Sequence, residues 1–201
     1  MVIKMCTKNI TSCNGLELQP KTWKGNNIIF NTNCYIYALN LPQNPYTGKG
    51  YLTWDHVQPG NLGGNNQFGQ LRGPFQKNTF IERVKKDLEV IGMEIVESTY
   101  DEVRKGKWWK VALAFENSLY FNDYHWWRQN LDGTWSHKPG KNRVQNTDNS
   151  DNIITNPETC NRGNYSTFAG FFMIRKKPGR KKKAFKKAQF EQNKIYNLRF
   201  S

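Results

Sequence analysis

The chain has 201 residues, with 30 Lys and Arg against 16 Asp and Glu, which gives a net charge of +14. Only 37% of the residues are hydrophobic, but 14% are aromatic, and each aromatic side chain buries about 150–250 Å², so a single core can form. No apolar run reaches the roughly eighteen residues of a membrane span. The four cysteines are too few for a dense disulfide framework. These features exclude a membrane-spanning chain and a disulfide-rich scaffold.

The composition divides the chain into three parts. Residues 1–27 alternate without a sustained period and contain Gly and Pro, which predicts a loop-rich N-terminal segment. Residues 28–174 carry the predicted helices and strands. Residues 175–201 hold eleven Lys and Arg against Glu191 alone, so +10 of the net charge lies in a basic C-terminal tail. No signal sequence is visible in residues 1–20, and we expect an intracellular or virion-associated protein.

The first predicted helix is short and carries a cysteine. Asn31–Asn33 are residue types that favour a helix N-cap, and residues 34–39 read as a buried helix that Pro42 stops. The Cys34 thiol would then lie at a helix N-terminus, where the helix dipole favours a thiolate. Residues 42–78, rich in Gly and Pro, predict a long functional loop, in which His56 reads as a surface or turn residue.

The remaining elements are one clear helix and several strands. Residues 79–91 place apolar side chains on one face, with Thr79 as the expected cap and Gly92 as the end. The strand candidates are residues 93–97, 108–115, 124–129, 134–137 and 165–174, and a polar loop covers 141–165. Asp132-Gly133 predicts a hairpin between the third and fourth strands. Helices followed by antiparallel strands indicate the α+β class.

Two of the three histidines fall on that hairpin. Alternate residues of a strand share a face, so His125 and His137 are expected to lie opposite or nearly opposite each other. A cysteine nucleophile needs a base, and the base needs a partner that fixes its tautomer. We therefore predict Cys34 as nucleophile, His125 as base and His137 as its orienting partner.

Two further expectations concern the surroundings of this site. We expect the cleft and oxyanion region to be lined by Asn33, Tyr35 and Trp127, with no metal and no cofactor. A zinc site built from Cys34, His125, His137 and Cys160 is an alternative. It lacks the short Cys-x-x-Cys or His-x₃₋₅-His spacing that anchors such sites. Cys160 otherwise reads as a structural or free thiol in a polar loop.

The pattern of one early cysteine and two histidines twelve residues apart resembles the NlpC-type papain-fold cysteine peptidases. Asn33-Cys34-Tyr35-x-Tyr37-Ala38-Leu39 and Asp132-Gly133-x-Trp135-Ser-His-Lys-Pro-Gly140 are also similar to a little-described group of microbial and viral proteins. The resemblance covers roughly residues 28–173. It implies a papain-like fold and a thiol hydrolase with peptidase or amidase activity on a peptide or amide substrate, working through a Cys-His-His triad.

Two other functions fit the charge layout. One is a structural virion or capsid-associated protein, or an interaction protein, on the same fold with a basic anchoring tail. The other is a nucleic-acid binder that acts through the tail alone. In either case the tail would meet an acidic protein, nucleic acid or an anionic surface. The basic residues expected to make this contact are Arg175, Lys176, Lys177, Arg180, Lys181, Lys182, Lys183, Lys186 and Lys187.

Overall fold

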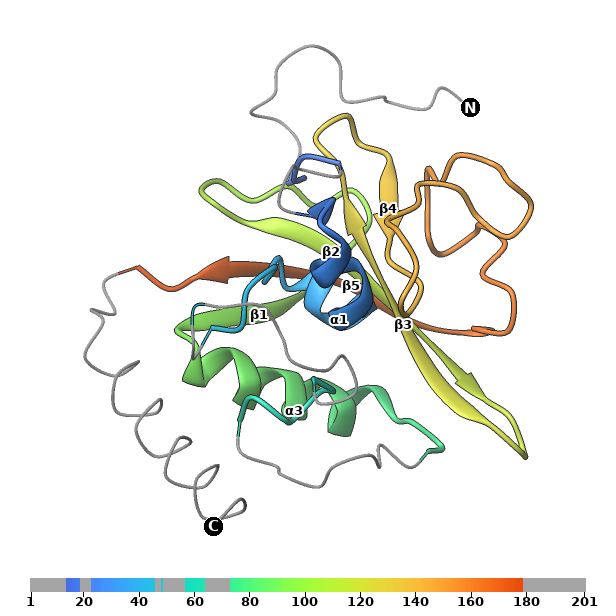
Figure 1. The fold of residues 1–201 in the computed structure, drawn as a ribbon, viewed down its shortest axis with the longest axis horizontal. Helices are drawn as coiled ribbons and strands as arrows, with labels where there is room; N and C mark the ends of the chain where they lie inside the picture. The colour runs from blue at the N-terminus through green and yellow to red at the C-terminus, as the bar shows by residue number, and fades with distance from the viewer. Residues whose placement is uncertain (1–13, 19–22, 46–47, 49–56, 64–72, 179–201) are drawn as a thin grey trace.

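The computed structural model describes residues 14–18, 23–45, 48, 57–63 and 73–178 (Figure 1). Its strands form one antiparallel five-stranded sheet in the order β1-β5-β2-β3-β4. This arrangement confirms the predicted α+β class. The elements are α1 (Asn26–Asn31), α2 (Cys34–Ala38), α3 (Lys77–Val90), β1 (Met93–Ser98), β2 (Trp109–Asn117), β3 (Asn122–Gln129), β4 (Trp135–His137) and β5 (Thr167–Lys176).

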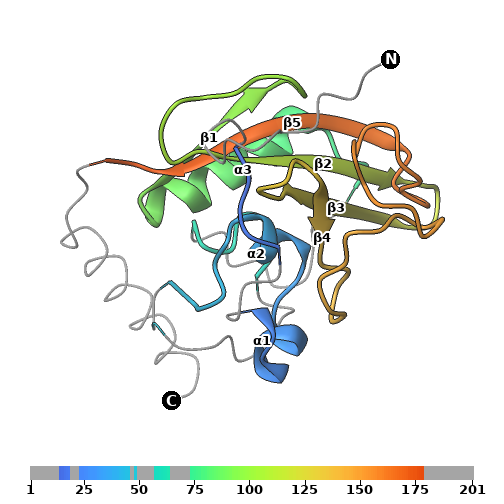
Figure 2. The ribbon, with the colours of Figure 1, turned by 90° about the horizontal axis from the view of Figure 1, so that it is seen from above.

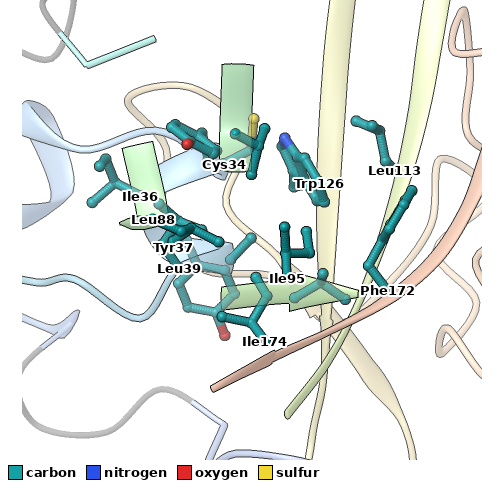
Figure 3. Close-up of a cluster of buried hydrophobic side chains, with 14 of the residues drawn as sticks. Cys34, Ile36, Tyr37, Leu39, Leu88, Ile95, Leu113, Trp126, Phe172 and Ile174 are labelled. Carbon is teal, nitrogen blue, oxygen red and sulfur yellow. The ribbon is translucent and has the colours of Figure 1, made fainter. Parts of the chain in front are cut away.

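Helices cover one face of the sheet. Helix α2 contacts β3 and β4, and α3 contacts β1. In Figure 2, seen from above, β5 and β2 cross the molecule with α2 on one side of them. The main hydrophobic core lies between these layers and joins Leu88 of α3, Trp126 of β3 and Phe172 of β5 (Figure 3).

The opposite face of the sheet has a smaller core of its own. Trp127, Trp135 and Phe171 gather there with Ile154, which comes from the loop between β4 and β5. Successive residues of a strand point to opposite faces, so Trp126 and Trp127 enter different clusters although they are neighbours in sequence. Strand β3 is therefore covered on both sides.

The two predicted helices form, with small differences at their ends. Helix α2 begins at Cys34, and the Asn33 side chain caps it by accepting a hydrogen bond from the Ile36 N–H at 3.1 Å. Helix α3 begins two residues earlier than predicted. Thr79 is not its cap, because its hydroxyl donates to the Gln76 carbonyl at 3.1 Å. Gly92 follows the helix with φ +73°, as the sequence predicted.

Both ends of the predicted body need correction. Leu16 forms a bridge with Asn130 at the end of the hairpin, and Trp23 is buried, so part of the N-terminal segment packs on the body. At the other end β5 runs to Lys176. Arg175 pairs there with Glu94 of β1 at 2.5 Å and is part of the sheet, not of a solvated tail.

Several predicted features lie outside the described residues. They include His56 and, of the basic tail, the positions Arg180, Lys181, Lys182, Lys183, Lys186 and Lys187; Cys6 and Cys13, the other two of the four cysteines, also lie outside. In the part of the chain that the structure describes, no helix combines the length and the apolar character needed to cross a bilayer.

Leu88 tests the packing of α3 on the sheet. Its side chain is fully buried in the main core, so Leu88→Ala should lower the free energy of unfolding by about 2–5 kcal/mol. Urea denaturation, monitored by circular dichroism, measures this change in the free energy of unfolding. Arg83→Ala, on the exposed face of the same helix, should change it by less than about 0.5 kcal/mol. Equal effects of the two substitutions would contradict the packing.

Candidate functional site

The hairpin of β3 and β4 brings His125 and His137 into direct contact. The register places Trp127 opposite His137, so His125 lies diagonally across from it on the same face. His125 Nε2 and His137 Nδ1 are 2.7 Å apart. His137 Nε2 in turn lies 3.1 Å from the carbonyl oxygen of Thr147 in the following loop. The predicted proximity of the two imidazoles is thus observed as a hydrogen bond.

The direction of this chain follows from the chemistry of its last member. A carbonyl oxygen only accepts, so His137 must carry its proton on Nε2 and, when neutral, must accept on Nδ1. His125 then donates from Nε2. A neutral His125 with this tautomer keeps an unprotonated Nδ1, which is the nitrogen that can take up a proton.

The two imidazoles are enclosed by aromatic rings. The rings of Trp127 and Tyr165 lie 4.7 Å and 5.0 Å from the His125 ring, centroid to centroid. The Tyr165 hydroxyl donates to the Asp123 carboxylate at 2.8 Å, which fixes this ring beside the imidazole. Burial, and then the neighbouring His137, hold the pKa of His125 well below its ordinary value, and burial also lowers the pKa of His137. Both rings are therefore neutral at pH 7.

Cys34 lies against the backbone of the strand that carries His125. Its thiol donates to the Tyr124 carbonyl at 3.9 Å, and the Trp126 backbone N–H is close enough to lower the thiol pKa. Figure 3 shows Cys34 beside Trp126 in the main core. The sulfur thus meets β3 at the peptide groups on either side of His125. Among the described residues it makes no hydrogen bond to either imidazole.

The prediction that the helix dipole makes Cys34 a thiolate is wrong for this structure. Burial raises the pKa of the thiol to about 12, and it outweighs the lowering effects of Trp126 and Lys138. A helix of five residues supplies only a weak dipole, whereas transfer of a thiolate out of water is costly. Cys34 is a neutral thiol at pH 7.

The residues expected around the cleft and the oxyanion have other contacts. The Asn33 amide donates to the Val57 carbonyl at 3.0 Å besides capping α2. Tyr35 is fully buried, and its hydroxyl donates to Asp87 at 2.7 Å. Trp127 packs in the small core on the opposite face. In this arrangement all three side chains support the elements around Cys34.

Two charged residues near the site were missed from the sequence. Asp87 is buried in α3 and accepts from the backbone N–H groups of Gly60 and Gly63 at 2.7 Å and 2.6 Å, so it holds the loop beside Cys34. Lys138, next to His137, is 1% exposed. The signal for Asp87 was its position on the apolar face of the predicted helix, where an unpaired carboxylate is costly. Lys138 gave no comparable signal.

The zinc alternative gains no support. Cys160 is only partly buried, and its thiol donates to the Pro157 carbonyl at 3.7 Å in the loop between β4 and β5. Within the described ranges, no group of three or more His, Cys, Asp or Glu side chains could hold a metal ion. The hydrogen bonds of the imidazoles, among the described residues, are to each other and to the Thr147 carbonyl.

The depressed pKa of His125 should make the protein less stable in acid. The unfolded chain takes up protons near the ordinary histidine pKa of about 6.5, whereas the folded protein does so only at lower pH. The free energy of unfolding should therefore fall between pH 7 and pH 5, in part because of this residue. Urea denaturation at both pH values should show a smaller fall for His125→Gln than for the wild type. An identical fall would contradict the burial of a neutral imidazole.

Comparison with known proteins gives one informative similarity. Insoluble matrix shell protein 1 of Ruditapes philippinarum is 28% identical to this chain over 158 residues, which are 79% of this chain and 89% of that protein. No protein-family model matches the chain. No solved structure matches it either.

Proposed function

We propose that the protein is a thiol hydrolase that cleaves a peptide or amide bond, with Cys34 as nucleophile and His125 as base. The observation that carries this proposal is the chain from His125 to His137 to the Thr147 carbonyl. It leaves Nδ1 of His125 unprotonated, on the strand against which the sulfur of Cys34 lies. A nucleophile, a base and an orienting partner are the three parts that such a reaction needs.

The first half of the reaction begins from a neutral thiol and a neutral imidazole. In the proposed step Nδ1 of His125 removes the proton of Cys34 as the sulfur attacks the substrate carbonyl carbon. The carbon–oxygen π electrons move to the oxygen, which the backbone N–H of Cys34 helps to stabilise. His125 then returns the proton to the leaving amine as the carbon–nitrogen bond breaks, and a thioester remains.

Water completes the cycle through the same groups. His125 takes a proton from water as the water attacks the thioester, and the thiol leaves with that proton. Because burial raises the Cys34 pKa to about 12 and lowers that of His125, the resting pair is neutral. Proton transfer must therefore accompany attack. We also propose that the fold is papain-like, which is supported by the cysteine at the start of α2 and by the packing of this helix on an antiparallel sheet.

Cys34→Ala should abolish turnover without unfolding the protein. A panel of fluorogenic peptide amides, together with peptide-crosslinked cell-wall glycan, serves as substrate, and circular dichroism checks the fold. Cys160→Ala is the matched control, because it removes the other cysteine in the described part of the chain and should leave turnover unchanged. If the wild type cleaves a substrate and Cys34→Ala cleaves it equally fast, the assignment of the nucleophile is wrong.

His137 should act through His125 and not as the base itself. His137→Gln should reduce turnover about 10²–10⁴-fold, the range typical of general acid–base catalysis, because the tautomer of His125 is no longer fixed. His125→Gln should reduce it at least as much. The kcat values of both variants on the best substrate of the panel provide the comparison. A larger loss for His137→Gln than for His125→Gln would reverse the proposed roles.

A second candidate is a structural component of an extracellular matrix. It is favoured by the similarity to a protein named for an insoluble shell matrix and by the burial of Cys34, which is only 6% exposed. This candidate replaces the expected intracellular or virion location with an extracellular one. The histidine chain would then only brace the hairpin.

The two candidates differ in what the sulfur does. If the protein is purely structural, no substrate of the panel is cleaved, and Cys34→Ala sediments with insoluble matrix material as the wild type does. If it is a hydrolase, a peptide carrying an electrophilic ketone in place of the scissile amide should label Cys34 and leave Cys160 unlabelled. Peptide-resolved mass spectrometry distinguishes the two results.

A further inference from the structure

Lys138 is a buried cation whose hydrogen bonds, in the part of the chain that the structure describes, all go to backbone oxygens. Its ammonium donates to the carbonyls of Ile29, Thr32 and Gly140 at 2.7, 2.5 and 2.6 Å. These three bonds satisfy the donors of the ammonium but do not neutralise its charge. The ion pairs among the described residues involve other basic side chains: Lys77, Lys85, Arg104 and Arg175.

The position of this cation links the two halves of the proposed site. Ile29 and Thr32 belong to the segment that leads into Asn33 and Cys34. Lys138 itself follows His137 at the end of β4. A single side chain therefore ties the start of the cysteine helix to the end of the histidine strand. A buried charge without a counter-charge is costly, so a group that becomes negative nearby would be stabilised by it.

Resting on the proposed function, we infer that Lys138 is a positioning residue of this site. Its ammonium, held by backbone carbonyls, stabilises the negative charge that develops on the sulfur of Cys34. The charges around Cys34 agree with this. Lys138 is the cation that lowers the thiol pKa, whereas Asp123 raises it. Tyr124 and Tyr165 are also near enough to interact electrostatically with Cys34, but both are neutral because burial raises their pKa values.

If Lys138 acts in this way, the reactivity of the Cys34 thiol should depend on pH in a characteristic manner. Burial lowers the pKa of Lys138 to about 8, and the nearby Cys34 acts in the opposite direction. Loss of the ammonium charge above about pH 8 should make the thiolate harder to form. An increase of about one unit in the pKa of the Cys34 thiol makes the thiolate about tenfold less abundant. The alkylation rate of Cys34 should therefore rise with pH, flatten near pH 8, and rise again.

The experiment measures alkylation of the Cys34 peptide by iodoacetamide between pH 6.5 and 9.5, resolved by mass spectrometry. The wild type should show the flattening, and Lys138→Arg, which keeps its charge throughout, should give a straight rise. Lys138→Met should react about tenfold more slowly below pH 8. The matched control is Lys110→Met, which removes another buried lysine, bonded to the Tyr100 carbonyl, and should keep the wild-type profile.

Each outcome decides the question. A straight wild-type profile, or a flattening that persists in Lys138→Arg, overturns the inference even if Lys138→Met fails to fold. If Lys138 had only a structural role, its substitution would change the alkylation rate of Cys34 by the same factor at every pH, and the wild-type profile would show no flattening. Alkylation needs no turnover, so flattening in a protein that cleaves nothing supports the role of Lys138 while rejecting the hydrolase. If the protein cleaves a substrate but the alkylation profile of Cys34 is straight, the hydrolase is supported and the role of Lys138 is rejected.

Discussion

Alternation of side chains along β3 is the constraint on which the rest of the structure depends. Trp126 and Arg128 point toward the helices, whereas His125 and Trp127 point toward the loop that follows β4. A shift of one residue in the register would exchange these two sets. It would place imidazoles in the main core and indole and guanidinium groups beneath a polar loop.

Burial of polar groups in this protein is made possible mainly by backbone oxygens and N–H groups. Arg128 is fully buried, lies 3.9 Å over the Tyr37 ring and donates to the Tyr37 carbonyl at 3.1 Å. Asp87 accepts from two loop N–H groups, and Lys138 donates to three carbonyls. Hydrogen bonds to charged groups contribute more than those between neutral ones. Arg128 therefore fastens the end of α2, Asp87 fastens the loop of Gly60 and Gly63, and Lys138 fastens the segment before Cys34.

The sequence allowed the local parts of the site to be predicted but not their electrostatic state. The cap at Asn33 and the approach of His125 to His137 follow from short-range rules, namely N-cap preference and the period of two across an Asp-Gly hairpin. The raised pKa of Cys34 depends on its burial in the main core against β3, where residues from distant parts of the chain come together. The bridge from Leu16 to Asn130 was missed for the same reason. Lys138 was missed because lysine is almost never fully buried.

The brevity of β4 has a consequence for where the sulfur can sit. The strand ends at His137, and Pro139 lies two residues later. Proline has no N–H that could bond a neighbouring strand. Beyond that point the edge of β3 at Tyr124 and Trp126 has no strand partner among the described residues, and the thiol of Cys34 lies where the backbone of such a strand would be. Continuing the register by three residues would pair positions 138, 139 and 140 with Trp126, His125 and Tyr124 and would cover the two peptide groups that the sulfur approaches. Because β4 ends early, the thiol of Cys34 can contact the backbone edge of β3 directly.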